Sequence, residues 1–224
     1  MVAVTQTQED APAPFTPEAL ESGRRLFGLP CTFVTGVASL PQLPAHALPE
    51  IAFIGRSNVG KSSLLNAVTG HTALARVSVT PGRTREINFF DLGGKLMLVD
   101  LPGYGYAKAP KAMSAQWQKL ITAYLRGRAA LARICLLIDA RHGIKPNDRE
   151  MMRMLDQAAQ SYLVVLTKAD KLSVAEQAAA TRNASAIAAK HPAAYPLVLL
   201  TSSEHGLGIA ELRAHLAVLA ASAV

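Results

Sequence analysis

A glycine-rich octapeptide is the first segment of this chain whose residue types could do chemistry. Positions 55–62 read G-R-S-N-V-G-K-S and satisfy the phosphate-loop pattern G-x-x-x-x-G-K-[ST]. Glycines allow backbone N–H groups to turn toward a β-phosphate, while Lys61 is expected to bridge the β- and γ-phosphates and Ser62 to bind Mg²⁺. Alone, this loop does not distinguish ATP from GTP. The predicted phosphate-binding residues are Gly55, Arg56, Ser57, Asn58, Val59, Gly60, Lys61 and Ser62.

A second motif, Asp100-Leu101-Pro102-Gly103, ends a later apolar segment. The Asp100 carboxylate can hold a water of Mg²⁺, and the Gly103 N–H can meet a γ-phosphate. Loss of that phosphate would release the loop, so the motif predicts a switch. Ras-type enzymes place a water-orienting glutamine after this glycine, but here the residue is Tyr104. We therefore expect slow intrinsic hydrolysis.

A third motif predicts which base is bound. Thr167-Lys168-Ala169-Asp170 follows the apolar run 163–166. The Asp170 carboxylate can accept the N1–H and N2 amino hydrogens of guanine while the Lys168 stem covers the ring. Adenine offers no such pair of donors, so GTP is preferred over ATP. The loop Thr201-Ser202-Ser203 is expected to back the guanine O6 and to steady Asp170.

These motifs need a scaffold of strands and helices. Short apolar segments alternate with helical ones, and Gly93-Gly94 predicts a hairpin between the second and third strands. The pattern predicts a three-layer α/β P-loop NTPase fold of the Ras-like G-domain type: a six-stranded, mostly parallel sheet with an antiparallel second strand and helices on both faces. A final helix is expected to pack on the sheet through Ile209, Leu212, Leu216 and Leu219. The candidate strands are 51–54, 85–91, 95–100, 133–139, 162–167 and 197–201.

The predicted domain organisation has three parts. Residues 1–15 are polar and proline-containing, which predicts a mobile tail. Residues 16–49 are expected to form an extension that packs on the G domain of residues 50–224. Within the extension, Thr16 and Pro17 predict the start of a helix that ends near Phe27. The segment 31–37 is a candidate edge strand.

Composition restricts the class of protein. The chain has 224 residues, of which 50% are apolar and 17% charged, as in a globular domain. Cys31 and Cys135 have no metal-type spacing, and Cys135 lies in an apolar run. No secretory signal and no apolar stretch of about 20 residues is visible, so we expect a cytoplasmic protein without membrane insertion. The histidines show no metal-ligand spacing.

The net charge of +7 is unevenly distributed. Between Tyr104 and Ile138 there are six basic residues and no acidic one, which indicates either an RNA-binding surface or a solvated helix face. Tyr104 and Tyr106 could stack on exposed bases or pack against a neighbouring helix. The six basic residues are Lys108, Lys111, Lys119, Arg126, Arg128 and Arg133.

The motifs GRSNVGKSS, TPGRT, DLPGYGYA, LTKADKL and TSS occur in this order, and they resemble the EngB (YihA) family of bacterial P-loop GTPases. This family belongs to the TrmE-Era-EngA-YihA-Septin-like class. The resemblance covers about residues 30 to 220. It implies binding of GTP and GDP with Mg²⁺, a role in assembly of the large ribosomal subunit, and a need for the protein in cell division and septation. It also implies that the partner is a large-subunit precursor or its rRNA rather than DNA. We expect a monomer.

The resemblance also assigns roles by position. The threonine that closes on Mg²⁺ should be Thr84, with Thr80 as the alternative; Thr80 precedes Pro81, which favours an extended connection. Ser62 and Thr84 are then the metal ligands, and Lys61, Thr84, Gly103 and Asn58 the catalytic residues. Further nucleotide-binding residues on this segment are Gly82, Arg83, Thr84, Arg85 and Glu86.

Two departures from the commoner GTPase signature bear on rate and affinity. Asn58 resembles the asparagine that holds K⁺ in potassium-dependent GTPases, although it could instead brace the loop. Thr167 replaces the usual asparagine, a change that EngB-type chains share. We expect this change to remove a tie between the base loop and the phosphate loop, and nucleotide affinity to be weak.

Two alternatives to a GTP-hydrolysing switch stay open. One is a module that binds GTP without hydrolysing it, which the missing glutamine at Tyr104 allows. The other is a P-loop kinase for a small acceptor. A kinase is disfavoured because the middle of the chain carries the Asp100 and Asp170 motifs rather than an arginine-rich lid.

Overall fold

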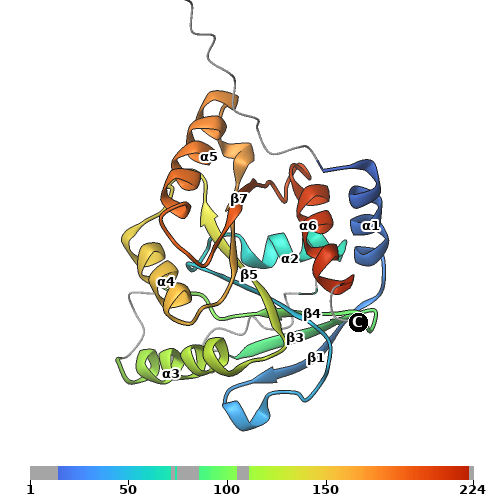
Figure 1. The fold of residues 1–224 in the computed structure, drawn as a ribbon, viewed down its shortest axis with the longest axis vertical. Helices are drawn as coiled ribbons and strands as arrows, with labels where there is room; N and C mark the ends of the chain where they lie inside the picture. Colours follow the sequence, from blue (N-terminus) through green and yellow to red (C-terminus); the bar gives the residue numbers. More distant parts are fainter. Residues whose placement is uncertain (1–14, 72–73, 75–85, 105–110, 222–224) are drawn as a thin grey trace, which may run out of the picture.

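The computed structural model describes residues 15–71, 74, 86–104 and 111–221, with only the backbone described for 111–118. Its centre is one sheet with the strand order β1-β3-β4-β2-β5-β6-β7. Strand β3 runs antiparallel to both of its neighbours, and the remaining pairs are parallel (Figure 1). The strands are β1 (Cys31–Val37), β2 (Glu50–Gly55), β3 (Ile87–Leu92), β4 (Leu96–Asp100), β5 (Leu131–Asp139), β6 (Tyr162–Thr167) and β7 (Ala194–Leu200).

The predicted fold class is confirmed, with one correction to the strand count. The sheet has seven strands because the candidate edge strand, now β1, pairs with β3 from Cys31↔Leu92 to Val37↔Ile87. Without β1, strand β3 would present its unpaired backbone groups to solvent. The predicted hairpin is also present, since Gly93 and Gly94 have φ values of 59° and 63° between β3 and β4.

Helices cover both faces of the sheet, and the strand residues alternate between two cores. Ile51 and Phe53 of β2 pack with one set of helices, while Ala52 and Ile54 pack with the other. The first face carries α1 (Pro17–Phe27), α2 (Lys61–Thr69) and α6 (Ile209–Ala221). The second carries α3 (Lys111–Gly127), α4 (Pro146–Gln157) and α5 (Val174–Ala188).

The amino-terminal helix and the last helix pack against each other. Thr16 caps α1 by accepting the Ala19 N–H at 3.2 Å, as its position before Pro17 predicts. Gly23 allows the close approach, because a Cβ there would lie 2.5 Å from the backbone nitrogen of Ala214. The predicted apolar stripe of α6 lies in the core that this helix shares with α2 and the sheet.

A buried ionic network fixes the start of β2, the strand that leads into the phosphate loop. Glu50 is 0% exposed, and its carboxylate accepts hydrogen bonds from Arg128 Nε at 2.8 Å and from the Tyr124 hydroxyl at 2.7 Å.

Arg133 is also bonded within the protein: it donates to the Ser161 hydroxyl at 2.8 Å and lies over the Tyr195 ring. Arg128 and Arg133 therefore have partners within the protein, so of the six basic residues these two are less available to an RNA than exposed side chains would be.

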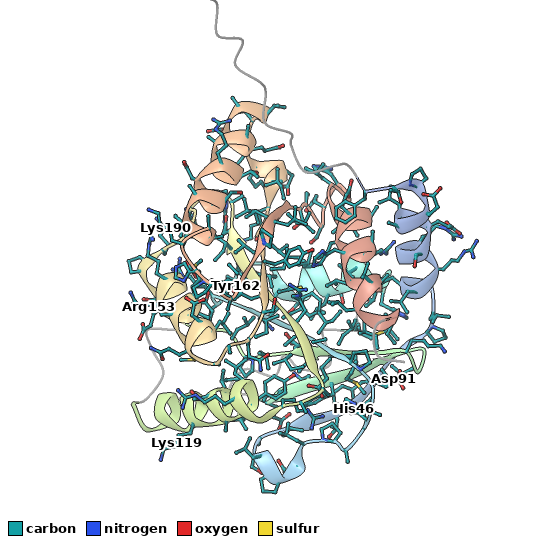
Figure 2. All side chains as sticks on the ribbon, viewed as in Figure 1. His46, Asp91, Lys119, Arg153, Tyr162 and Lys190 are labelled. Atoms are coloured by element: carbon teal, nitrogen blue, oxygen red, sulfur yellow. The ribbon has the colours of Figure 1, made fainter. Side chains whose placement is uncertain are left out.

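Exposed charged side chains lie on the outer helices and on the loops between elements. Lys119, Arg153 and Lys190 point away from the molecule, whereas Tyr162 lies in the interior with 0% exposure (Figure 2). Among the described helices, none has the length and apolarity to cross a membrane.

Candidate functional site

The phosphate loop connects the end of β2 to the start of α2. Two residues turn it with positive φ: Asn58 at 64° and Gly60 at 102°, and Gly60 is the N-cap of α2. The loop is pressed against β5, since a Cβ on Gly55 would lie 2.8 Å from the Val59 side chain and 2.9 Å from the Leu137 carbonyl oxygen. A glycine is therefore required at position 55. The backbone geometry matches a phosphate cradle at a helix N-terminus.

The side chains of Lys61 and Asp100 form an ion pair at this loop. The Lys61 ammonium contacts the Asp100 carboxylate, and the two side chains are only 15% and 6% exposed. Asp100 is the last residue of β4, which lies beside β2 in the sheet. The fold thus brings together the two charges that the sequence assigned to phosphate and to Mg²⁺, although they are 39 positions apart.

The segment after Asp100 is docked directly on the phosphate loop. The Tyr104 N–H donates to the Gly55 carbonyl and the Ser57 N–H donates to the Tyr104 carbonyl, both at 3.2 Å. Gly103 fits closely here, because a Cβ on it would lie 3.2 Å from the Gly55 carbonyl oxygen and 3.3 Å from the Ser57 nitrogen. A group that engages the Gly103 N–H would therefore also act on the phosphate loop.

Tyr104 packs inward instead of facing a nucleotide or RNA. Its ring is 5% exposed, and its hydroxyl donates to the Asp148 carboxylate of α4 at 2.8 Å. Burial, and next the Asp148 charge, raise the pKa of Tyr104 above its ordinary value. Of the two roles considered for this tyrosine, packing against a helix is confirmed and base stacking is not. Tyr106 lies outside the described residues.

Thr167 ties the base loop to the phosphate loop, and this corrects a prediction. Its hydroxyl donates to the Val59 carbonyl at 2.6 Å, with a second contact to the Ile138 carbonyl at 3.3 Å. The hydroxyl does here what an asparagine amide was expected to do. The premise for weak nucleotide affinity, that this tie is lost, is therefore wrong.

Replacing Thr167 with valine should weaken GDP binding by about three- to tenfold, because one buried hydrogen bond is lost while the shape is kept. A fluorescence titration with a labelled GDP would measure this. Thr181→Val is the matched control, since the Thr181 hydroxyl bonds only within α5, to the Gln177 carbonyl at 2.9 Å. Equal GDP affinity of Thr167→Val and wild type would show that the tie does not support the site.

Asp170 is held ready to accept hydrogen bonds. Its side chain is 5% exposed, the Ser202 hydroxyl donates to it at 2.7 Å, and Lys171 contacts it at 3.0 Å. The Ser202 hydrogen bond, followed by the Lys171 bond, holds the pKa of Asp170 below its ordinary value, so it is ionised at neutral pH. The geometry agrees with the prediction that the 201–203 loop steadies Asp170.

Backbone hydrogen bonds of the 201–203 loop leave fewer N–H groups available to a guanine O6. The Thr201 N–H donates to the Leu166 carbonyl at 2.7 Å, and the Ser202 N–H donates to the Leu207 carbonyl at 2.9 Å. Both groups are thus used within the protein. Of the three predicted N–H donors, Ser203 is the one that stays a candidate.

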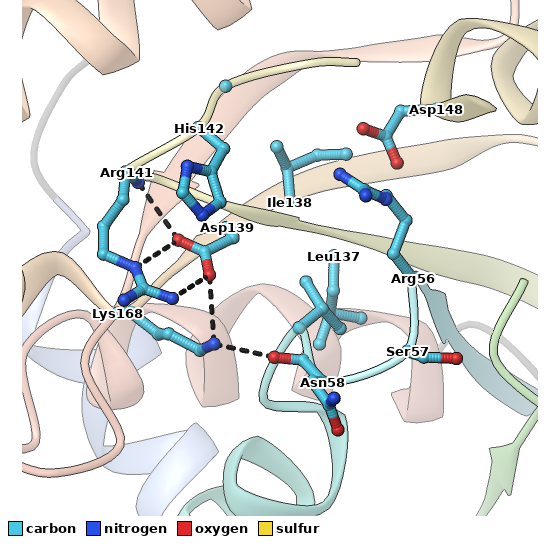
Figure 3. A pocket seen from close by; sticks show the side chains of 12 residues that line it. Arg56, Ser57, Asn58, Leu137, Ile138, Asp139, Arg141, His142, Asp148 and Lys168 are labelled. Carbon is cyan, nitrogen blue, oxygen red and sulfur yellow. Dashed lines mark hydrogen bonds and ion pairs between the residues drawn. The ribbon is translucent and has the colours of Figure 1, made fainter. Parts of the chain in front are cut away.

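Two residues at the site, Asp139 and Arg141, lie outside all the sequence motifs. Asp139 is the last residue of β5, and its carboxylate accepts a hydrogen bond from Arg141 Nε at 2.9 Å and contacts Lys168 Nζ at 3.0 Å (Figure 3). Lys168 Nζ also donates to the Asn58 carbonyl at 2.7 Å. These residues line a pocket of about 220 Å³ that also reaches Arg56. The position of Asp139 at the carboxyl end of a parallel strand was the available signal.

Part of the predicted site lies outside the described residues. Glu86, which directly precedes β3, is described. Its carboxylate lies against β1, where a Cβ on Gly36 would be 2.5 Å from Glu86 Oε2. The choice between Thr84 and Thr80 stays a prediction. Outside the description are Thr80, Gly82, Arg83, Thr84, Arg85 and Lys108, and of Lys111 only the backbone is described.

The described residues fit a magnesium-bound guanine nucleotide. Ser62 stands in the first turn of α2, beside the Lys61–Asp100 pair, which supplies one charge for phosphate and one for a metal-bound water. Asp170 offers a charged acceptor for the base. When bound, Mg²⁺ would neutralise phosphate charge.

Comparisons with known proteins agree with this geometry. The family model described as "50S ribosome-binding GTPase" matches residues 50–168. A protein of Rhodospirillum rubrum named "Probable GTP-binding protein EngB" is 61% identical over 207 residues, 90% of either chain. A protein of the same name from Caulobacter vibrioides is 52% identical over 204 residues, which are 91% of this chain and 89% of the relative.

Solved structures show the same fold. The crystal structure of a probable GTP-binding protein engB matches with a TM-score of 0.61 and 22% identity, over 77% of this chain and 99% of the other. Era in complex with MgGDPNP and nucleotides of 16S ribosomal RNA matches with a TM-score of 0.58 and 23% identity, over 77% of this chain and 56% of Era. The loops after β4 and β6 both contact the loop after β2, and relatives match this chain over nine-tenths of its length, so the chain belongs to the EngB family of P-loop GTP-binding proteins.

Proposed function

We propose that this chain hydrolyses GTP slowly with Mg²⁺ and uses the nucleotide state as a switch in assembly of the large ribosomal subunit. It acts in this proposal as a cytoplasmic monomer, and normal cell division and septation depend on it. One observation supports the switch. The backbone of Tyr104 is hydrogen-bonded to Gly55 and Ser57, so the loop that follows Asp100 is in direct contact with the phosphate loop. In this proposal, a γ-phosphate that engages the Gly103 N–H alters that contact.

In this proposal, nucleotide binding exchanges the partners of two charges. Lys61 leaves Asp100 for the β- and γ-phosphates, and Asp100 is then free to hold a metal-bound water. Ser62 and Thr84 are the proposed Mg²⁺ ligands. At the other end, Asp170 accepts from guanine N1 and N2, the Lys168 stem covers the ring, and Ser203 is left to reach O6.

Slow hydrolysis follows from the position of Tyr104. Its side chain is turned into the core and bonded to Asp148, so it cannot orient an attacking water. Charge in the transition state must then be stabilised by another group. Asn58 is the proposed ligand of a K⁺ ion that does this: its side chain is exposed, while its backbone carbonyl accepts a hydrogen bond from Lys168 Nζ.

Turnover in KCl should exceed turnover in NaCl by at least about tenfold, because a cation placed beside the β- and γ-phosphates stabilises developing charge. Asn58→Gly should remove this difference. Glycine accepts the φ of 64° at this position without strain, whereas alanine does not, so any added loss in Asn58→Ala reports backbone strain. Equal rates of phosphate release in both salts would reject the K⁺ site.

The ribosomal role rests on similarity and on surface charge. The matching family is described as ribosome-binding, and Era was crystallised with ribosomal RNA. Of the six basic residues in the stretch, Arg128 and Arg133 are excluded by their internal partners, while Lys119 and Arg126 are exposed on α3. A smaller footprint on α3 is thus proposed.

Co-sedimentation with 50S subunits or their precursors should be stronger in the GTP state than in the GDP state, and should weaken as salt is raised. Lys119→Glu with Arg126→Glu should reduce binding by about tenfold or more at low salt. Lys190→Glu, at an exposed lysine in the turn after α5, is the matched control. Binding that is equal in both nucleotide states, or insensitive to salt, would contradict the switch.

A single-turnover assay separates this proposal from its competitors. Release of phosphate from GTP in K⁺ buffer, with and without ribosomal subunits, would be absent for a module that only binds GTP. A kinase would require a small acceptor for phosphate transfer. Phosphate release that subunits accelerate is the result expected for the switch.

A further inference from the structure

The carboxylate of Asp139 is surrounded by cationic groups at the base end of the site. Arg141 binds it with both ends of its guanidinium, Nε to Oδ1 at 2.9 Å and Nη2 to Oδ2 at 2.7 Å, and with its backbone N–H at 3.1 Å. The ammonium of Lys168 lies 3.0 Å from Oδ2 (Figure 3). Both carboxylate oxygens are therefore occupied, and Asp139 cannot rotate without breaking contacts on two elements.

Lys168 is a residue that needs such a partner. Its backbone is in the left-handed region at φ 62°, and its side chain is 28% exposed, so its long stem would otherwise sample many rotamers. Its ammonium has two anchors, Asp139 and the carbonyl of Asn58 in the phosphate loop at 2.7 Å. These two contacts hold the Lys168 ammonium between the end of β5 and the phosphate loop, and they restrict the rotamers of the stem.

We propose that Asp139 and Arg141 form a clamp that positions Lys168 over the purine ring. The clamp then sets the affinity of the site for the ring and leaves the reading of the base edge to Asp170. It rests on the proposed function, in which the Lys168 stem covers the guanine. Asp139 and Arg141 are positioning residues, since their contacts are with Lys168 and with each other.

Electrostatics explain why the clamp needs a charged carboxylate. Partial burial acts to raise the pKa of Asp139, but hydrogen bonds from Arg141 and Lys168 outweigh it and hold the pKa well below its ordinary value. Asp139 is therefore ionised at neutral pH. With the charge removed, Arg141 and Lys168 would face each other as two uncompensated cations, and Lys168, the more flexible, would swing away.

The experiment compares Kd values for GDP and IDP, which differ only in the 2-amino group. Asp139→Asn should weaken both by about tenfold and leave their ratio unchanged, because the ring is common to both bases. Arg141→Met keeps the carboxylate and should weaken both by about threefold. Arg141→Met also serves if Asp139→Asn fails to fold. Asp156→Asn is the matched control and should bind like wild type, because Asp156 lies on α4 and pairs with His191 just before the start of β7.

A double-mutant cycle separates positioning from general damage. In a Lys168→Met background, Asp139→Asn should have no further effect, because the group that it positions is gone. Three results would overturn the clamp alone. They are additive effects of the two substitutions, a changed ratio of the GDP and IDP affinities, and wild-type affinity of Asp139→Asn when Lys168→Met binds more weakly. Wild-type affinity of Lys168→Met would overturn the clamp together with the proposed base site.

Discussion

Asp170→Asn is expected to weaken GDP binding by between about a hundredfold and ten-thousandfold. Two hydrogen bonds to a charged acceptor are lost, each worth about 1.5–3 kcal/mol. Asp170 is held in place by the Ser202 hydroxyl and Lys171, so little else in the loop should change. The measurement is a competition titration against a labelled nucleotide.

The same substitution should raise the affinity for XDP. Xanthine carries an oxygen at C2 where guanine carries an amino group, so an asparagine NH₂ can donate where the Asp170 carboxylate could only accept. Specificity is thus exchanged instead of lost, which a misfolded variant cannot imitate. Asp91→Asn is the control, because Asp91 only caps the β3–β4 hairpin by accepting the Gly94 N–H at 2.7 Å. A parallel loss of both nucleotides would show that Asp170 does not read the base.

Most of the scaffold could be predicted because its signals are local. Short apolar runs bounded by glycine and polar residues indicate strands, and the motif loops fall at their ends. The largest boundary error was in β7, predicted to begin at residue 197 but starting at Ala194. Proline is unfavourable inside a central strand, but Pro196 lies on β7 at the edge of the sheet, where a proline can be accommodated without loss of a ladder hydrogen bond.

The side-chain partners could not be predicted because they are remote in sequence. The Thr167 hydroxyl bonds a carbonyl 108 positions away, and the Tyr104 hydroxyl bonds Asp148 at a distance of 44 positions. Nothing in either motif shows which way the side chain turns. Arg128 is similar, since its partner Glu50 is 78 positions away, and its charge therefore looked like part of a surface. Residue type predicted the chemistry, while topology decided which groups face the nucleotide.

Lys61→Met is expected to lower the rate of GTP hydrolysis by about a hundredfold to a thousandfold. The variant removes the charge that stabilises the β- and γ-phosphates as the bond breaks. It should also destabilise the nucleotide-free protein, because Asp100, with only 6% of its side chain exposed, would lose its partner. Phosphate release and urea unfolding measure the two effects separately. Lys190→Met, at an exposed lysine in the turn after α5, should change neither.

The double variant Lys61→Met/Asp100→Asn separates the two roles of the ion pair. With both charges gone, no unpaired carboxylate is left, so the stability of the nucleotide-free protein should return toward wild type. Hydrolysis should stay low, since neither the phosphate charge nor the metal-water ligand is restored. Recovery of hydrolysis in the double variant would mean that Lys61 acts only by neutralising Asp100. The partner exchange at the phosphate loop requires the opposite result: the pair can be dispensable for folding, but Lys61 must reach the phosphates for the reaction to proceed.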